Sequence, residues 1–419
     1  MEHIAYPGVS MSLELKTVLV TIHGPDRPGI AAGMMDLLAS QDCEIYDVGQ
    51  ITIRGRLMLN VLIGVPAERA TVRDLLFFCW ENELEVDFEV VDPTPTPPRK
   101  LSVVTVIGPS VTAEEYAGVT SAIALGGANI ERIVRLSRYP VVSYELTISG
   151  GDVAAITDDL VTLAAATPID VAIQPDGLAR RAKRLVVMDV DSTLIQEEVI
   201  DLLARENGVE REVSALTDAA LAGEVDFAES LRARVRLLAG LEEGALSKVA
   251  SEITLTPGAR TLIRTLQRLG IKTAIVSAGF MRFSRALAER LGIDYYLSNT
   301  LEVVDGVLTG GLVGDFVDGP RKAEFVAEIA AAEGIPLDQV VAIGDGANDL
   351  HMLRSVGLGI AFNAKPTVAA QADTSIRVPY LDPILFLLGI QREHVEMADS
   401  EDDELDTAEL MPVPDLPPA

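Results

Sequence analysis

Hydrophobic and polar positions follow one another in two different ways along the chain, and the change comes near residue 184. Before it, short strands of alternating pattern and amphipathic helices occur in an order that appears twice. After it, apolar runs of four to six residues alternate with amphipathic helices, which is typical of a parallel sheet covered on both faces. We therefore expect two α+β domains followed by an α/β domain with a doubly wound parallel sheet.

The two repeats are expected over residues 12–92 and 100–176, each with the order strand, helix, strand, strand, helix, strand (βαββαβ). Such a unit buries one face of an antiparallel sheet under two helices. The predicted elements of the first repeat are Thr17–Ile22, a loop His23–Gly29, Ile30–Ser40, Ile45–Ile53, Arg56–Val65, Thr71–Glu81 and Glu85–Val91. Those of the second are Leu101–Ile107, Ala113–Leu125, Asn129–Arg138, Val142–Ser149, Asp152–Ala165 and Asp170–Gln174. Proline-rich residues 93–99 are the predicted linker between them.

The α/β domain is expected over residues 184–394, with predicted strands at Leu185–Met188, Thr273–Val276, Val340–Ile343 and Gly359–Phe362. A long insertion after the first strand, about residues 195–255, reads as almost entirely helical and is expected to cap the strand ends. The basic segment 179–184 is predicted to be a solvated lead-in. The acidic, proline-containing tail 395–419 is predicted to be disordered.

Composition narrows the function classes. The 419 residues contain 34 Lys and Arg against 63 Asp and Glu, so the net charge is 34 − 63 = −29, which argues against a nucleic-acid partner. No apolar run is long enough to predict a membrane span, and the N-terminal residues lack a signal-peptide pattern, so we expect a cytoplasmic protein. The two cysteines are expected to fill core space. An acidic protein that handles an anion needs a local island of positive charge, such as a metal ion, a Lys and an Arg.

The segment Val187-Met-Asp-Val-Asp-Ser-Thr-Leu194 places two carboxylates, Asp189 and Asp191, at the end of a buried strand. Ligands of doubly wound sheets bind outside the carboxyl ends of the strands. Two buried negative charges without a cation are costly, so the pair predicts a cation site. The alternative is that both aspartates merely cap the following helix.

A second acidic turn follows another buried strand, in the segment Gly344-Asp-Gly-Ala-Asn-Asp349. Asp345 and Asp349 are hard oxygen ligands that suit Mg²⁺. A simple turn is the alternative for this segment in isolation.

Two further segments carry groups that bind anions. In Val276-Ser-Ala-Gly279 a strand ends in a hydroxyl and small residues before a helix, which leaves N–H groups exposed to an anion; Ser277 as a helix N-cap is the alternative. Lys322 lies at the start of a helix, where its positive charge opposes the helix dipole. A lysine at this unfavourable position indicates that it binds a negatively charged ligand. The alternatives are an exposed lysine at this position, and Arg321 as the functional cation.

These four segments, in this order, resemble the motifs of the haloacid-dehalogenase-like phosphatase family, and most closely the phosphoserine phosphatases, over about Leu185–Gly389. The resemblance implies Asp189 as nucleophile and Asp191 as general acid and base. It implies Mg²⁺ held by Asp189, the Asp191 backbone carbonyl and Asp345, with Asp349 orienting that shell. Ser277 and Lys322 would neutralise the phosphoryl oxygens.

The same resemblance implies a substrate site for O-phosphoserine. Glu198 would hold the substrate ammonium and Arg234, in the cap segment Phe227–Arg234, its carboxylate. Surface helix charges are the alternative for both. The remaining implied substrate-binding residues are Phe227, Ala278, Gly279 and Asn348. Ala278 departs from the glycine that many relatives have at this position.

The two repeats resemble ACT domains, which are small ligand-binding modules. The loop Gly24-Pro-Asp-Arg-Pro-Gly29 matches the strand-to-helix loop that binds amino acids in such modules, and only Gly108-Pro109 of it persists in the second repeat. This resemblance implies a regulatory site that includes Asp26, Gly29 and Gly108, with serine as its expected effector and a homodimer as the expected assembly. A turn without a ligand remains the alternative.

Three readings of function differ from a serine-forming phosphatase. The first is a phosphatase or phosphotransferase for another small phosphomonoester. The second is a catalytically inactive amino-acid sensor, which has no need of both Asp189 and Asp191. The third is a P-type ATPase, which requires membrane helices that the sequence does not predict.

Overall fold

The computed structural model describes residues 15–66, 70–92, 100–221 and 225–401. The chain divides into two compact units, residues 1–98 and residues 99–419, and each is considered by itself. The predicted linker 93–99 lies outside the described residues. Among the described helices, none combines the length and the apolar character needed to cross a bilayer.

The first unit is a βαββαβ domain, as the sequence predicts. Its elements are β1 Leu15–Pro25, α1 Ile30–Ser40, β2 Glu44–Ile53, β3 Arg56–Pro66, α2 Thr71–Glu81 and β4 Glu85–Val90. The strands form an antiparallel sheet of order β2-β3-β1-β4. Strand β1 runs three residues further than expected, because Gly24 and Pro25 continue the ladder opposite Leu57 and Arg56. The predicted loop is therefore shorter than His23–Gly29.

The second βαββαβ domain opens the second unit. Its elements are β5 Leu101–Gly108, α3 Ala113–Leu125, β6 Ala128–Ser137, β7 Val142–Gly150, α4 Val153–Ala166 and β8 Asp170–Pro175, with sheet order β6-β7-β5-β8. Helix α3 begins with a capping box in which the Thr112 hydroxyl accepts from the Glu115 N–H and the Glu115 carboxylate accepts from the Thr112 N–H. Helix α4 has a simple N-cap, in which the Asp152 carboxylate accepts from the Ala154 and Ala155 N–H groups.

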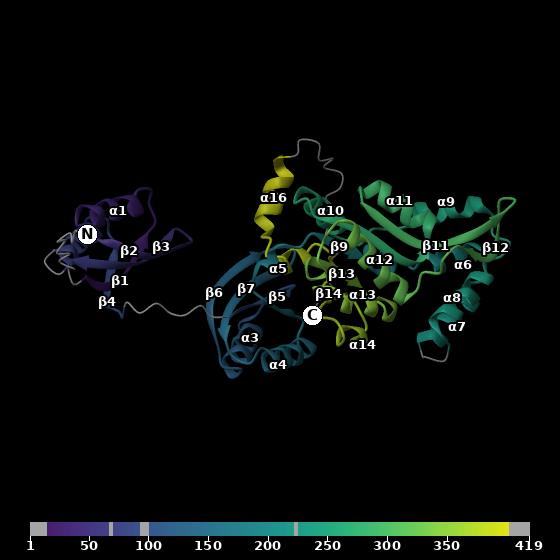
Figure 1. The fold of residues 1–419 in the computed structure, drawn as a ribbon, viewed down its shortest axis with the longest axis horizontal. Coiled ribbons are helices and arrows are strands. Elements are labelled where there is room, and N and C mark those ends of the chain that lie inside the picture. The colour runs from purple at the N-terminus through teal and green to yellow at the C-terminus, as the bar shows by residue number, and fades with distance from the viewer. Residues whose placement is uncertain (1–14, 67–69, 93–99, 222–224, 402–419) are drawn as a thin grey trace, which may run out of the picture. The chain divides into compact units, whose positions relative to one another are not determined.

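The α/β domain is built on a seven-stranded sheet of order β12-β11-β10-β9-β13-β14-β15, with β9 in its middle (Figure 1). The strands are β9 Leu185–Met188, β10 Lys272–Phe280, β11 Tyr295–Val304, β12 Val307–Val313, β13 Val340–Gly344, β14 Leu358–Phe362 and β15 Thr374–Ile376. Alternate residues of β9 belong to two different apolar clusters. Val186 and Met188 lie in one cluster, and Leu185 and Val187 lie in the other. The central strand is therefore covered on both faces, as its continuous apolar run predicts.

The helices of this domain lie before, between and after the strands. They are α5 Leu178–Arg181, α10 Ala259–Arg268, α11 Met281–Leu291, α12 Gly319–Ala332, α13 Leu350–Arg354, α14 Pro366–Ala369, α15 Ile384–Leu387 and α16 Arg392–Glu401. The insertion between β9 and β10 contains α6 Val199–Glu206, α7 Glu210–Leu221, α8 Phe227–Arg236 and α9 Glu243–Glu252. The predicted helical insertion over about residues 195–255 is thus observed.

The sheet is not parallel throughout, because β12 pairs antiparallel with β11. The two strands are joined at Asp305 and Gly306, which have φ values of 51° and 77°. Positive φ at both central residues is typical of the tight hairpin turn that Asp-Gly favours.

The second βαββαβ domain is joined to the α/β domain by a shared core. Ile107, Leu136, Val141 and Ala172 belong to the same apolar cluster as the α/β domain. The sheet of this repeat therefore packs with one face under its own helices and with the other against the α/β domain, although most residues of β6 are exposed or half-buried.

Two predictions at the borders of the α/β domain are wrong in part. In the basic segment 179–184, Arg180 and Lys183 are buried, with 5% and 7% exposure, whereas Ala179, Arg181 and Arg184 are exposed as expected. Arg180 pairs with Glu145 at 2.5 Å, and the Lys183 Nζ donates to the Asp338 carbonyl at 2.7 Å. Residues 395–401 of the predicted disordered tail are helical, because α16 buries Val395 and ion-pairs through Asp399 with Arg264. Residues 402–419 lie outside the described part of the chain.

Candidate active site

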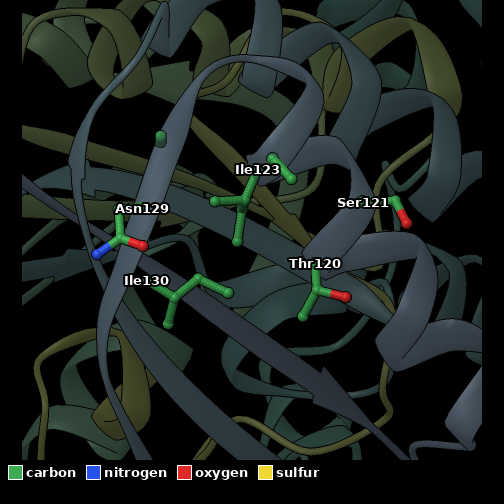
Figure 2. Close-up of a pocket in the computed structure, with 7 residues that line it drawn as sticks. Thr120, Ser121, Ile123, Asn129 and Ile130 are labelled. Carbon is green, nitrogen blue, oxygen red and sulfur yellow. The ribbon is translucent and has the colours of Figure 1, made fainter.

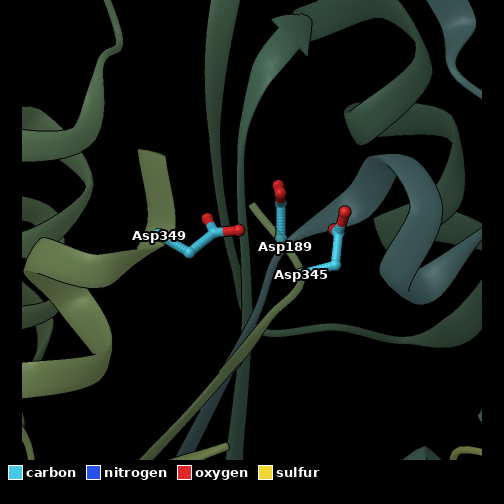
Figure 3. A group of neighbouring side chains, drawn as sticks. All are labelled: Asp189, Asp345 and Asp349. Carbon is cyan, nitrogen blue, oxygen red and sulfur yellow. The ribbon is translucent and has the colours of Figure 1, made fainter. Parts of the chain in front are cut away.

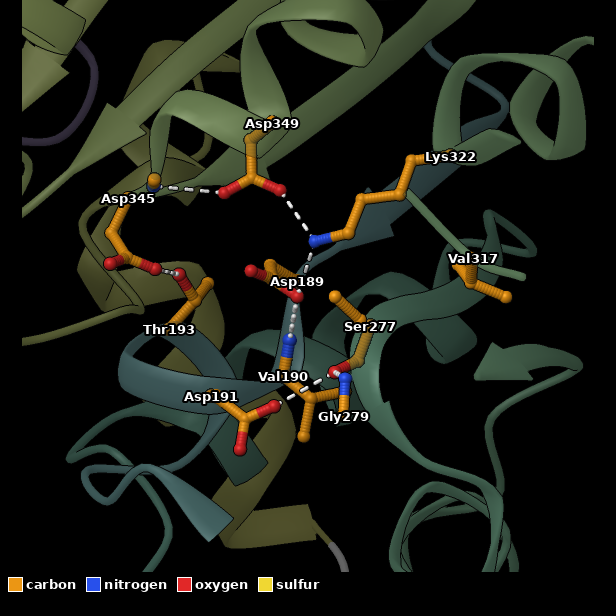
Figure 4. A network of polar contacts seen from close by, with 12 residues as sticks. Asp189, Val190, Asp191, Thr193, Ser277, Gly279, Val317, Lys322, Asp345 and Asp349 are labelled. Carbon is orange, nitrogen blue, oxygen red and sulfur yellow. Dashed lines mark hydrogen bonds and ion pairs between the residues drawn. The ribbon is translucent and has the colours of Figure 1, made fainter. Parts of the chain in front are cut away.

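The carboxyl end of β9 carries the first two carboxylates. Asp189 continues the strand's ladder by donating its N–H to the Ile343 carbonyl at 2.9 Å, and its own carboxylate accepts from the Val190 N–H at 2.7 Å. The chain then turns through Ser192, whose φ of 56° is left-handed. This turn directs Asp191 toward Ser277 (Figure 4). The first motif is therefore a loop at the strand end in which both carboxylates also cap. Asp189 accepts from Val190 at the start of the short π-helix Val190–Leu194, and Asp191 accepts from Val199, the first residue of α6.

Lys322 lies between two carboxylates. Its Nζ is 2.9 Å from Asp189 Oδ1 and 2.7 Å from Asp349 Oδ1, and its side chain has no solvent exposure. Burial opposes the charged form, but the two carboxylates outweigh it and raise the pKa of Lys322. An exposed lysine is thus excluded, whereas Arg321 points to the surface of its helix and pairs with Glu328 at 2.8 Å.

Ser277 joins the turn after β10 to the nucleophile loop. Its hydroxyl donates to Asp191 Oδ2 at 2.8 Å and accepts from the Gly279 N–H at 2.7 Å. The other Asp191 oxygen accepts from the Val199 N–H at 2.9 Å. Burial raises the pKa of Asp191, although these hydrogen bonds oppose that rise. Ser277 does not cap helix α11, which begins at Met281 without a side-chain cap.

Asp189, Asp345 and Asp349 form an acidic cluster in which one oxygen of each lies within 4.8 Å of the others (Figure 3). Thr193 donates to Asp345 at 2.9 Å, and the Gly346 N–H donates to Asp349 at 2.9 Å. Burial and the charge of Asp349 raise the pKa of Asp345 to about 7 and that of Asp189 well above its usual range. The carboxylates therefore favour the protonated form unless positive charge is brought close to them.

Charge counting indicates what this cluster can hold. Three ionised carboxylates against the single ammonium of Lys322 leave two negative charges without compensation. A divalent cation with oxygen ligands supplies that charge, and carboxylates are its preferred protein ligands. The residues present therefore fit a divalent metal ion.

Two charged groups, Arg234 and Glu198, come from the insertion between β9 and β10. Arg234 on α8 is 7% exposed, its Nε has no partner among the described residues, and its Nη1 donates only a long 3.4 Å hydrogen bond to Thr217. Burial lowers the pKa of Arg234. Glu198, the N-cap residue of α6, accepts from the Ser192 hydroxyl at 2.7 Å. Glu198 keeps solvent access on one side, yet the surrounding protein and the charge of Asp191 raise its pKa to about 7.

Comparisons with known proteins identify the family of the chain. Residues 186–354 match the family model of haloacid dehalogenase-like hydrolases, and residues 16–89 and 102–174 match models of ACT domains. The chain is 49% identical to a phosphoserine phosphatase of Streptomyces coelicolor, with 95% of this chain and 98% of that protein covered. It is 45% identical to the phosphoserine phosphatase SerB2 of Mycobacterium tuberculosis, with 92% and 96% covered. This chain belongs to the phosphoserine phosphatase family of haloacid dehalogenase-like hydrolases.

Solved structures of similar enzymes support this membership in the family. A haloacid dehalogenase-family hydrolase of Salmonella enterica superposes with a TM-score of 0.60 at 30% identity, covering 68% of this chain and 98% of that one. A probable phosphoserine phosphatase of Vibrio cholerae, in unliganded form, gives a TM-score of 0.54 at 33% identity, covering 71% and 88%.

The other expected residues of this family member lie at varying distances from the polar network. Gly279 takes part through its N–H, as described above. The Ala278 carbonyl accepts from the Asn299 side chain at 2.7 Å. Phe227 is half-buried and packs against the core, and Asn348 is half-buried beside the Asp349 turn. Among the described residues, neither side chain has a hydrogen bond to the carboxylates of the site.

Two polar residues of the site were not predicted individually. Thr193 lies in the first motif, two residues after Asp191. Its place in that motif could have marked it as a residue of the site. Thr256 closes the cap insertion, and its hydroxyl donates to the Thr193 carbonyl at 2.6 Å. The partner of Thr256 is 63 residues away, and no local pattern predicts such a contact.

Asp26 and Gly29 lie in the loop that follows β1, whereas Gly108 is the last residue of β5, where it pairs with Val142. Gly29 has a φ of 96° at the start of α1, and the Asp26 N–H donates to the Gly55 carbonyl at 2.9 Å. A side chain at Gly108 would clash with the Ser110 carbonyl at 2.7 Å. A hollow of about 420 Å³ lies elsewhere on the second repeat, between the end of α3 and the start of β6 (Figure 2). Neither Gly108 nor any of the site carboxylates lines this hollow.

Proposed function

We propose that the protein hydrolyses O-phospho-L-serine to L-serine and inorganic phosphate through a phosphorylated Asp189. The observation that carries this proposal is the convergence of Asp189, Asp191, Ser277 and Lys322 at the carboxyl end of the central strand, next to an acidic cluster. Membership in the phosphoserine phosphatase family supports the choice of substrate.

In the first step an Asp189 oxygen attacks phosphorus while the bond from phosphorus to the seryl oxygen breaks. The products are an acyl phosphate on Asp189 and serine. Lys322, 2.9 Å from Asp189, is placed to offset the charge of the phosphoryl oxygens, and the Ser277 hydroxyl and nearby N–H groups donate to them. Phosphoryl transfer depends mainly on such positioning and electrostatic stabilisation.

Asp191 provides the proton for the leaving seryl oxygen. Burial raises its pKa, which favours the protonated acid that this step needs. In the second step the same carboxylate, now ionised, takes a proton from the water that attacks phosphorus. That attack releases phosphate and restores the Asp189 carboxylate.

Asp189, the Asp191 backbone carbonyl and Asp345 would hold Mg²⁺, with Asp349 orienting this shell. When bound, Mg²⁺ supplies charge neutralisation of the phosphoryl group and keeps Asp189 ionised. Within the protein, Thr193 fixes Asp345 through its 2.9 Å hydrogen bond, and Lys322 with the Gly346 N–H fixes Asp349. These contacts orient the acids before a substrate arrives.

Recognition of the serine part falls to the cap side. Arg234 presents a buried guanidinium with unused donors, which suits a planar carboxylate. Glu198 presents a carboxylate to the substrate ammonium. Phe227 would pack against the substrate carbon chain, and Ala278, Gly279 and Asn348 would line the phosphate.

The direct test is a phosphate-release assay on the full chain with O-phosphoserine, O-phosphothreonine, glycerol phosphate and p-nitrophenyl phosphate, with Mg²⁺ and with a chelator. We expect Mg²⁺-dependent turnover with the highest kcat/KM for O-phosphoserine. Equal kcat/KM for all four esters would indicate the alternative, a phosphatase for another small phosphomonoester. No turnover of any ester would indicate a catalytically inactive amino-acid sensor.

Amino-acid binding by the ACT domains completes the proposal, with serine as effector and a homodimer as the assembly. The loop with Asp26 and Gly29 in the first repeat, and Gly108 in the second, would contribute the site. Exposed apolar side chains on the first repeat, such as Ile51, Ile53 and Met58, support association. Titration of the full chain with serine in a calorimeter, together with its mass in solution, tests both parts. A fragment ending at Gln174 is unsuitable, because it would expose the shared core around Ile107.

A further inference from the structure

The turn that carries Ser277 is an irregularity in the pairing of β10 with β11. The parallel register runs regularly to Val276 opposite Leu297, and the next pair is Phe280 opposite Asn299. Three residues of β10 therefore face one residue of β11. The extra length lifts Ser277 and Gly279 out of the ladder toward Asp191 (Figure 4). A bulge of this kind leaves backbone groups without their usual ladder partners.

Asn299 supplies the missing partners with its side chain. Its Nδ2 donates to the Ala278 carbonyl inside the bulge at 2.7 Å and to the Val317 carbonyl at 3.3 Å. Its Oδ1 accepts from the Val317 N–H at 2.8 Å. Both amide hydrogens and one oxygen lone pair are thus used, in a side chain that is 1% exposed.

Val317 leads directly into the helix that carries Lys322. Asp318 caps α12 by accepting from the Arg321 N–H at 3.0 Å, and Lys322 follows in the first turn. The start of α12 is also held against the Asp349 turn, since a side chain at Gly319 would meet the Asn348 carbonyl at 2.8 Å. One buried amide therefore connects the Ser277 turn to the helix start that places Lys322.

We propose that Asn299 is a positioning residue for phosphoryl transfer, which sets the spacing between the Ser277–Gly279 turn and Lys322. This inference rests on the proposed phosphatase function. Asn299 does not touch the carboxylates itself. It acts because the Ser277 hydroxyl, the Gly279 N–H and Lys322 must surround the same phosphoryl group. Among the described residues, the Asn299 side chain is the one that hydrogen-bonds to both Ala278 and Val317.

The test is the full-length variant N299A, assayed with O-phosphoserine and p-nitrophenyl phosphate in the presence of Mg²⁺. We expect kcat to fall about 30-fold to 100-fold with both esters, since small misplacements of reacting groups cost about that much. KM for O-phosphoserine should stay within about threefold, because the groups proposed to bind the amino acid lie on the cap side. The inhibition constant of inorganic phosphate should rise about tenfold, because phosphate probes the same spacing.

The matched control is S298A, which removes a buried hydroxyl from the neighbouring position of β11. Ser298 hydrogen-bonds with Ser284 and not with either loop. Each variant is assayed well below its own melting temperature, and S298A should keep kcat within about twofold. N299S keeps a hydroxyl that can donate to one carbonyl, so its kcat should lie between that of N299A and that of the parent. If N299A does not fold, N299S is compared with S298A instead.

An unchanged kcat in folded N299A or N299S would overturn the proposal, as would an equal loss of kcat in S298A. Failure of the proposed substrate gives a different result. If the parent protein does not turn over O-phosphoserine but N299A still loses turnover of p-nitrophenyl phosphate, the substrate is wrong and the role of Asn299 stands.

Discussion

The core side and the cap side of the site differ in how their charged groups are satisfied. On the core side Lys322 already contacts Asp189 and Asp349, and Ser277 already donates to Asp191. On the cap side the buried Arg234 has an unpartnered Nε among the described residues and only one long hydrogen bond. The difference supports the proposal that the groups for phosphoryl transfer are assembled in advance, whereas Arg234 is left to pair with the charge of a substrate.

The difference between the two sides predicts which substrates each substitution should affect. Changes on the core side should slow the turnover of every phosphate ester. Changes on the cap side should slow only esters that carry an ammonium and a carboxylate. The predictions below follow this rule from the largest expected effect to the smallest.

The substitution D189N should abolish the first chemical step. The amide is similar in size but is a very poor nucleophile, so kcat should fall by at least about 10³-fold with O-phosphoserine and with p-nitrophenyl phosphate. Steady-state phosphate release measures this loss, and circular dichroism checks that the fold is retained. Substantial O-phosphoserine turnover by D189N would remove Asp189 from the role of nucleophile.

Removal of one carboxylate of the proposed metal site should lower activity, and binding of the metal ion should stabilise the fold. We expect D345N to lose about 10²-fold in kcat/KM at limiting Mg²⁺, again with both esters. In the parent, saturating Mg²⁺ should raise the free energy of unfolding by about 2–4 kcal/mol.

The stabilisation by Mg²⁺ should depend on pH in a defined direction. Burial raises the pKa of Asp345 to about 7 and that of Asp189 well above its usual range. Protons therefore compete with the metal ion below about pH 7, and Mg²⁺ should stabilise the protein more at about pH 8 than at about pH 6. Thermal unfolding with Mg²⁺ and with a chelator measures this, and an equal gain at both pH values would contradict the cluster as the metal site.

The substitution R234A should separate the two sides of the site. We expect KM for O-phosphoserine to rise about 30-fold to 100-fold and KM for p-nitrophenyl phosphate to change less than about threefold, since only the first ester carries a carboxylate. The matched control is R236A, an exposed arginine on the same helix, which should leave both KM values unchanged. An equal rise in both KM values would contradict the proposal that Arg234 on the cap side binds the substrate carboxylate.

Glu198 should give the smallest effect, which is visible as pH dependence. Its pKa of about 7 means that the carboxylate is mostly ionised at pH 8 and mostly protonated at pH 6. Only the ionised form pairs with an ammonium, so the ratio of kcat/KM for O-phosphoserine to that for p-nitrophenyl phosphate should fall about tenfold from about pH 8 to about pH 6. E198Q should flatten this ratio, and a ratio that stays equally steep in E198Q would assign the dependence to another group.

The parts of the fold that follow local rules were predictable from the sequence. Helices α1 and α3 have the predicted bounds, because their apolar spacing and their flanking loop residues are local signals. The antiparallel strand β12 was missed, although the Asp305-Gly306 pair is a hairpin signal. Here the prediction of a parallel sheet took precedence over local turn chemistry.

Contacts over long sequence distances were the parts that the sequence did not reveal. Arg180 looks like one of several solvated basic residues until its partner Glu145, 35 residues away, is seen across the boundary of the second repeat. The bridge made by Asn299 has the same character, since its partners lie 21 and 18 residues away. The motif residues were predictable because the chemistry restricts which residue types can serve, whereas these supporting contacts depend on the packing of the whole domain.

Rapid acid quench of the full chain during turnover of O-phosphoserine labelled in its phosphoryl group, followed by peptide mapping, tests the covalent step most directly. The label should appear on the peptide that contains Asp189, at the side chain of that residue, and it should be absent in D189N. Phosphate release without any labelled peptide, or a label on Asp191 instead, would contradict a phosphorylated Asp189.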